Sequence, residues 1–272
     1  MKRELFKGWK YVIVTYLVFA GMVLGICGVA SMVFHAGPVV MRVLSNICAW
    51  SPTIVLLIGF RYWCPDIGVR EYIKNMFSRR IKLHILIISA ASTGLTFMLT
   101  AFIYAIVKEE SFITLFSAGG TSVLLHILFS ILSGPTGEEL GWRGYLRVEF
   151  ENRYGFTKGN LLVGLVWTFW HGVLWVVDNE YTSGMELFIY IISNIVVITS
   201  IHLIMAVIME EENNILYSIV IHLFFNLPYC FLRSDITFYL IMMPLYVCVA
   251  SSFLFIRNVK KSLSGSKHSS LN

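Results

Sequence analysis

Long runs of uncharged apolar residues recur along this sequence, and they restrict its fold more than any other feature. Eight such segments can be marked off, and most reach or approach the ~17–25 residues that a helix needs to cross a bilayer. Inside hydrocarbon every backbone donor and acceptor must be satisfied within the segment, so each segment is predicted to be a helix. The predicted spans are Tyr11–Phe34, Arg42–Phe60, Leu83–Val107, Ser117–Ser133, Asn160–Val177, Leu187–Met209, Ile215–Phe231 and Ile236–Ile256.

The composition agrees with a membrane protein. Of the 272 residues, 57% are hydrophobic and 14% are charged, whereas a soluble domain carries about 25% charged residues. We therefore expect an all-α class, with a single helical-bundle domain of about eight transmembrane helices over residues 1–261. A disordered polar tail is expected over residues 262–272. The five cysteines are scattered without paired spacing, which indicates neither a disulfide framework nor a zinc knuckle.

The distribution of basic residues predicts the orientation. Of the 21 lysines and arginines, 18 fall in loops on the side of the N-terminus, and only Arg42, Lys108 and Arg233 fall on the other. Because cytoplasmic loops are enriched in lysine and arginine, we expect a multi-pass protein of the cell membrane with both termini in the cytoplasm. Since these charges sit at helix ends, they do not indicate nucleic-acid binding. The expected partners are the bilayer and a membrane-associated peptide or protein.

A charged, glycine-rich stretch follows the fourth apolar segment. Thr136 and Glu139 fit a capping box, which predicts an amphipathic helix over residues 137–150. On this helix Glu139 and Arg143 are i,i+4 neighbours and are expected to pair, while Glu138 points about 100° away. A desolvated carboxylate without an ion-pair partner suits a general base. The alternative is an interfacial helix whose charges are only solvated.

Two further polar clusters lie inside predicted spans. His171 shares a helical face with Trp167 and Trp175, and an ionisable residue within a span is a functional candidate. Its alternative role is an interhelical hydrogen bond or membership of an aromatic belt. His222 and Asn226 share a face four residues apart and are suited to donate hydrogen bonds to an oxyanion. Their alternative is to pair with each other or to join two helices.

Taken together, the three clusters predict water-mediated hydrolysis of an amide inside the membrane, provided that their faces converge. The sequence contains neither His-Glu-x-x-His nor Gly-x-Ser-x-Gly, which excludes a zincin helix and a nucleophile elbow. Two histidines and a glutamate are nevertheless ligands that zinc accepts. Direct catalysis by glutamate is favoured, and zinc stays an open alternative with His171 and His222 as its candidate ligands.

The order of these motifs resembles the CPBP family of intramembrane proteases, the Rce1-like CAAX-protease and bacteriocin-processing group also known as the Abi family. Three motifs carry the resemblance: Glu-Glu-x-x-x-Arg from Glu138, aromatic-x-x-x-His ending at His171, and His-x-x-x-Asn from His222. The eight-span layout resembles the family fold over nearly the whole chain. One departure is that the second motif usually opens with phenylalanine, and Trp167 occupies that position here.

The resemblance implies a role for each polar residue. Glu138 would activate the attacking water, assisted by His171. His222 and Asn226 would hold the oxyanion of the tetrahedral intermediate. Arg143 would orient the acidic pair, Glu138 and Glu139, through its contact with Glu139.

The expected function is therefore an intramembrane endopeptidase acting on a membrane-associated or lipid-modified peptide, with an active site that opens toward the cytoplasmic leaflet. Trp142, Trp167 and Trp175 are expected to contact the substrate. The alternative is a non-proteolytic membrane scaffold or immunity protein of the same fold that binds and regulates a membrane partner. A channel or transporter is disfavoured because no inverted repeat is visible.

Overall fold

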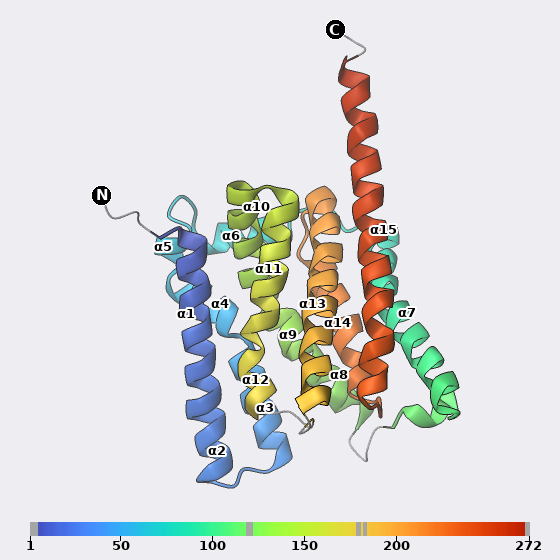
Figure 1. Cartoon of the computed structure of the whole chain (residues 1–272). Coiled ribbons are helices and arrows are strands. Elements are labelled where there is room, and N and C mark those ends of the chain that lie inside the picture. The colour runs from blue at the N-terminus through green and yellow to red at the C-terminus, as the bar shows by residue number, and fades with distance from the viewer. Residues whose placement is uncertain (1–4, 118–121, 178–180, 182–183, 270–272) are drawn as a thin grey trace.

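The computed structural model describes residues 5–117, 122–177, 181 and 184–269, and within them the chain is a bundle of helices without a strand. Phe116 and Leu232 form an isolated bridge. The predicted polytopic helical bundle is confirmed (Figure 1). Three predicted features lie outside the described residues, namely the basic pair Lys2 and Arg3, part of the fourth span at 118–121, and the last three residues of the tail.

Helices occupy almost all of the described chain. In the first half they are α1 (Lys7–Met22), η1 (Val23–Cys27), α2 (Gly28–Met32), α3 (Pro38–Ala49), α4 (Ser51–Ile58), α5 (Phe60–Trp63), α6 (Val69–Met76), α7 (Leu83–Lys108) and η2 (Phe112–Leu115). In the second half they are α8 (Val123–Leu132), α9 (Gly134–Gly137), η3 (Leu140–Leu146), α10 (Arg147–Tyr154), α11 (Phe156–Trp170), α12 (Gly172–Val177), α13 (Gly184–Glu212), α14 (Leu216–Tyr229) and α15 (Ile236–Ser269).

Five continuous helical stretches of the described chain are long and apolar enough to cross a membrane. They are α1 to α2, α7, α11 to α12, α13 and α15. A sixth crossing results if α3 and α4 are counted together, since they are bent by 45° at a short break. The multi-pass architecture is therefore present, with fewer uninterrupted spans than the eight predicted segments.

The remaining two predicted spans form shorter helices. The segment predicted at Ser117–Ser133 forms α8, and the segment predicted at Ile215–Phe231 forms the 14-residue helix α14. At 1.5 Å per residue both are too short for a hydrocarbon core of about 30 Å. In Figure 1, α8, α9 and α10 follow one another from one end of the bundle to the other. Broken helices are tolerated at membrane depth when other protein segments cover them.

The predicted amphipathic helix over residues 137–150 is wrong in two respects. It is divided among α9, the π-helix η3 and α10, and every residue from Gly141 to Leu146 is buried. Thr136 does not cap a helix, because its hydroxyl donates to the carbonyl of Ile131 at 2.7 Å. Gly141 has no side chain, which allows the phenol of Tyr11 to pack directly against η3.

α6 fixes η3 from another side. The hydroxyl of Tyr72 donates to the carbonyl of Leu140 at 3.0 Å, which satisfies a backbone group of the π-helix. Burial raises the pKa of the Tyr72 phenol above its usual value, so this hydroxyl keeps its proton and remains a donor. π-helical turns of this kind are frequent at functional sites.

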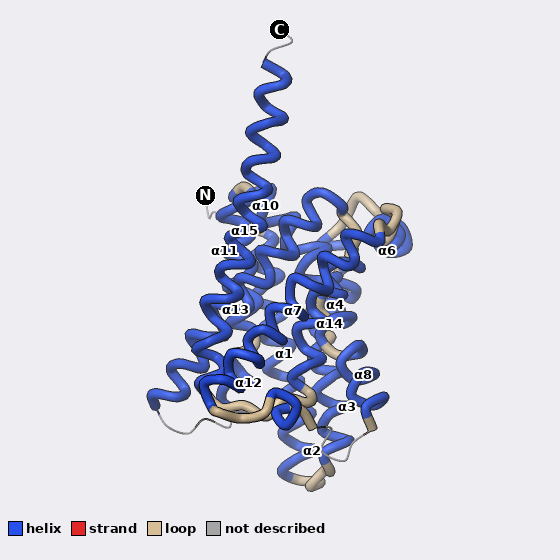
Figure 2. The backbone as a smooth tube through the Cα atoms, turned by 90° about the vertical axis from the view of Figure 1, so that its right-hand side faces the viewer, coloured by secondary structure: helices blue, strands red, loops and turns tan. Residues whose placement is uncertain are grey.

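The start of α1 and the end of α15 lie at the same end of the bundle in both views, together with α6 and α10 (Figures 1 and 2). α2 and the start of α3 lie at the opposite end. α15 continues to Ser269 and extends past the bundle, so part of the tail predicted to be disordered is helical. Where α15 leaves the bundle, its Arg257 donates to both carboxylate oxygens of Glu210 on α13, at 2.5 and 2.8 Å.

Candidate active site

Glu138 lies between α9 and η3 and is only 3% exposed. Its Oε2 accepts a hydrogen bond of 2.5 Å from the indole Nε1 of Trp167, which α11 carries 29 residues later. Gly134 leaves room for the other oxygen: a Cβ there would lie 2.6 Å from Glu138 Oε1 and 2.7 Å from His222 Nε2. Glu138 Oε1 and His222 Nε2 therefore face the same small space.

Glu139 joins η3 to α14. Its Oε1 accepts a hydrogen bond of 3.1 Å from Arg143 Nη1 and lies 2.7 Å from His222 Nδ1. The predicted i,i+4 contact between Glu139 and Arg143 is confirmed, and both side chains are buried. The Arg143 guanidinium also stacks on the Trp167 ring at 3.6 Å, a cation–π arrangement.

The contact with Glu139 determines what His222 can donate. An ionised carboxylate only accepts hydrogen bonds, so Nδ1 of His222 carries the hydrogen in this contact. His222 Nε2 then donates only when the ring carries a second proton. The contact of Nδ1 with Glu139 is the same in both protonation states.

His171 lies at the break between α11 and α12, and its Nδ1 is 2.9 Å from the carbonyl oxygen of Trp167. Because a carbonyl oxygen only accepts, Nδ1 is the donor. In the neutral ring Nε2 is therefore an acceptor, the form required of a base. The ring packs edge-on against Trp170, with centroids 4.8 Å apart.

Asn226 lies one turn after His222 on α14. The alternative in which His222 and Asn226 pair with each other is not observed, because His222 contacts Glu139 instead. Within the described part of the chain no other group bonds its carboxamide. Its amide is thus available to an incoming molecule.

A cavity of about 870 Å³ brings these groups together, and Glu138, His171 and Asn226 line it. Its lining continues to the ends of α2, α3 and α12, where Met32, Arg42 and Val177 form what we call the mouth. The mouth lies at the end of the bundle opposite the start of α1 and the end of α15. Which leaflet this end faces depends on the orientation of the termini, so the expected opening toward the cytoplasmic leaflet stays a prediction.

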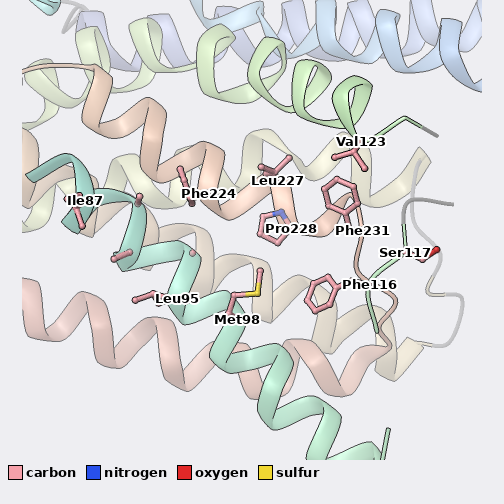
Figure 3. Close-up of a pocket in the computed structure, with 13 residues that line it drawn as sticks. Ile87, Leu95, Met98, Phe116, Ser117, Val123, Phe224, Leu227, Pro228 and Phe231 are labelled. Atoms are coloured by element: carbon pink, nitrogen blue, oxygen red, sulfur yellow. The ribbon is translucent and has the colours of Figure 1, made fainter. Parts of the chain in front are cut away.

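A second cavity lies on the other side of α14. It measures about 780 Å³ and is lined mostly by apolar side chains of α7 and α14, among them Leu95, Met98 and Phe224 (Figure 3). None of the polar motif residues, from Glu138 to Asn226, lines it. α14 therefore separates an apolar surface cavity from the polar one.

The three tryptophans predicted to contact the substrate do not line the polar cavity. Trp142 is fully buried and packs against Tyr11 and Trp170. Trp167 is 2% exposed and bonds Glu138, whereas Trp175 packs against Phe169. Trp170, which the motifs do not include, is the tryptophan that lines the cavity.

A buried chain of hydrogen bonds holds η3 and α10 against α11 and α13, and the sequence motifs do not reveal it. Arg147 donates to the Arg143 carbonyl at 3.2 Å and to Glu151 at 2.9 and 3.0 Å. Asn160 donates to Glu151 at 2.8 Å and its Oδ1 lies 3.0 Å from His202 Nε2. The i,i+4 spacing of Arg147 and Glu151 is the only sequence pattern that could have predicted a contact of this chain of hydrogen bonds.

The described residues do not arrange a metal site. No group of three His, Cys, Asp or Glu side chains among them is placed to hold an ion, whereas catalytic zinc commonly takes three protein ligands. Nδ1 of His171 is bonded to a carbonyl and Nδ1 of His222 to Glu139. These contacts leave Nε2 of both rings open, so zinc stays an alternative, and the chemistry below uses the protein's own groups.

Comparisons with known proteins cover this part of the chain. Residues 119–228 match a family model described as type II CAAX prenyl endopeptidase Rce1-like. CAAX prenyl protease 2 of Methanococcus maripaludis is 32% identical over 110 residues, which span 37% of this chain and 38% of the relative. The chain thus matches well under half of that relative's length. The matched segment contains all three motifs and the side chains that converge in the site, so the similarity to the Rce1-like CAAX endopeptidases covers this part of the chain.

Proposed function

We propose that the protein is an intramembrane endopeptidase of the CAAX-protease type. It hydrolyses a peptide bond of a membrane-associated or lipid-modified peptide with water activated at Glu138. The observation that carries this proposal is the convergence of Glu138, His171 and Asn226 on one cavity, with His222 directly beside the carboxylate. The name of the similar protein, a CAAX prenyl protease, supports a peptide bond as the target and a prenylated peptide as one substrate class.

In the activation step the two carboxylate oxygens of Glu138 have different partners. Trp167 occupies Oε2, so Oε1 is the oxygen left to accept a proton from water. As the water oxygen attacks the carbonyl carbon, its proton moves to Glu138 Oε1. His171 Nε2 accepts a hydrogen bond from the same water and orients its lone pair toward the carbonyl.

The tetrahedral intermediate carries its negative charge on the former carbonyl oxygen. Asn226 donates to this oxygen through its amide, and the doubly protonated His222 donates through Nε2. When the C–N bond breaks, the protonated Glu138 returns its proton to the leaving amine. The products are a carboxyl terminus and a new amine, and Glu138 is again ionised.

The direct test is Glu138→Gln, which keeps the shape of the side chain and removes its basicity. A general base contributes about 10²–10⁴-fold to rate, so turnover should fall by that factor. Glu71→Gln is the matched control, because Glu71 is an exposed glutamate of α6 that does not line the cavity.

Both variants would be compared with the wild type in lipid nanodiscs. The probes are a farnesylated peptide with a CAAX ending and membrane peptides extracted from cells that lack the protein, with cleavage followed by mass spectrometry. Wild-type turnover by Glu138→Gln would remove Glu138 from the mechanism. Full complementation of a null strain by Glu138→Ala would support the scaffold alternative instead.

A further inference from the structure

We propose that the substrate enters from the membrane face opposite the chain termini, and that Arg42 at the mouth selects peptides with a carboxylate beyond the scissile bond. This inference rests on the proposed function of the site. It adds the direction of entry and one chemical requirement on the substrate.

Packed aromatic rings close the site on the side of the termini. Tyr11, one turn from the start of α1, packs against Trp63 at 5.4 Å, Tyr145 at 4.9 Å and Trp142 at 6.0 Å between ring centroids. None of the four side chains is more than 8% exposed. A peptide has no route to Glu138 through this cluster.

The opposite side is open. Met32 is 80% exposed and Val177 is 51% exposed, and both line the same cavity as Glu138. They stand at the ends of α2 and α12 that lie farthest from the start of α1. The cavity is therefore continuous from the mouth to the catalytic carboxylate.

The distribution of charge places this mouth on the outer face. Only three of the 21 basic residues belong to that end, namely Arg42, Lys108 and Arg233. By the positive-inside tendency the other end is cytoplasmic. A substrate of this site is then a peptide presented from the extracytoplasmic side.

Arg42 is the one of these three cations that lines the cavity. Lys108 forms an ion pair of 2.5 Å with Asp235, whereas no carboxylate of the described chain pairs with Arg42. The Arg42 side chain is exposed, and its Nη2 lies 3.7 Å from Cys230 Sγ. A guanidinium in this position is free to bind a carboxylate through two parallel hydrogen bonds.

The position of Cys230 sets the spacing between Arg42 and the scissile bond. Cys230 caps the end of α14 and follows Asn226 by four positions, a rise of about 6 Å. An extended peptide advances about 3.3–3.6 Å per residue. A peptide whose scissile carbonyl is bonded to Asn226 would therefore bring a carboxylate about two residues downstream to Arg42. A C-terminal carboxylate and an acidic side chain both meet this requirement.

The direction of entry is tested by labelling. Single cysteines would be introduced as Met32→Cys at the mouth and as Glu71→Cys on α6 at the other end, with the label mapped by mass spectrometry. A membrane-impermeant maleimide applied to intact cells should label Met32→Cys, and should label Glu71→Cys only after permeabilisation. The reverse pattern would overturn the proposed direction, and this readout does not depend on turnover.

The carboxylate requirement is tested with apolar peptides of eight residues that end in a free carboxylate, in a carboxamide, or in a carboxamide preceded by an internal glutamate. Binding to the Glu138→Gln protein and cleavage by the active protein are both measured. A protein that keeps Arg42 should bind each peptide with a carboxylate at least 10-fold more tightly than the neutral carboxamide peptide. Comparing the free C-terminus with the internal glutamate shows which of these two carboxylates Arg42 prefers.

Arg42→Gln should abolish this preference by raising KM for the acidic peptide while kcat stays unchanged, and Arg42→Lys should restore part of it. Arg233→Gln is the matched control, because Arg233 is an exposed cation of the same end that does not line the cavity. An unchanged preference in Arg42→Gln would overturn the inference. A wild-type protein that binds the acidic peptides preferentially but cleaves none of the peptides would instead count against the proposed function.

Discussion

Replacing Trp167 by phenylalanine isolates the hydrogen bond that holds the catalytic carboxylate. Trp167→Phe removes the indole N–H that donates to Glu138 at 2.5 Å, but keeps an aromatic ring beneath the Arg143 guanidinium. The backbone carbonyl that accepts from His171 is also kept. Phenylalanine keeps an aromatic side chain at this buried position.

The magnitude follows from the chemistry of the bond. A hydrogen bond to a charged acceptor contributes about 1.5–3 kcal/mol, and both partners are buried here. Each 1.36 kcal/mol corresponds to a factor of ten in rate. If the bond serves to orient Glu138, kcat should fall by about 10- to 160-fold.

The assay is peptide cleavage in nanodiscs, with thermal unfolding measured on the same samples. Trp175→Phe is the control, since its ring packs against Phe169 and makes no contact with Glu138. It should lose little activity. A Trp167→Phe protein with wild-type kcat would refute the reasoning, because Glu138 would then be oriented without its donor.

Three further substitutions give outcomes with separate readouts. Gly134→Ala would place a methyl group 2.6 Å from Glu138 Oε1, so kcat should fall at least 10-fold with little change in Tm. Glu139→Gln removes the carboxylate that pairs with the buried Arg143 and contacts His222, and it should cost about 3–5 kcal/mol of stability, visible as a lower denaturation midpoint. Asn160→Leu should cost about 1–3 kcal/mol by leaving His202 without its partner, whereas a Tm equal to that of the wild type would contradict this role.

The sequence predicts local relations well. The contact between Glu139 and Arg143 follows from i,i+4 spacing within one helix, and the apolar runs locate the spanning helices because length and hydropathy decide insertion. Each of the eight predicted segments contains a helix. The three motifs also identify the segments whose side chains meet.

Relations between distant segments could not be predicted in this way. The bond from Trp167 to Glu138 joins residues 29 positions apart and depends on how α11 packs against η3. The same is true of the contact between His222 and Glu139, which are 83 positions apart. The burial of η3 was missed because its charged residues suggested a solvated face, whereas their partners come from other helices.

The broken crossing formed by α8, α9 and η3 also determines the order in which this protein can assemble. Alone in lipid, this segment would present two glutamates and an arginine to hydrocarbon, together with backbone groups freed at each break. Trp167 and His222, which satisfy these carboxylates, are synthesised later in α11 and α14. The segment therefore cannot insert as an independent unit, and it becomes stable in the bilayer only when the C-terminal half of the chain has joined it.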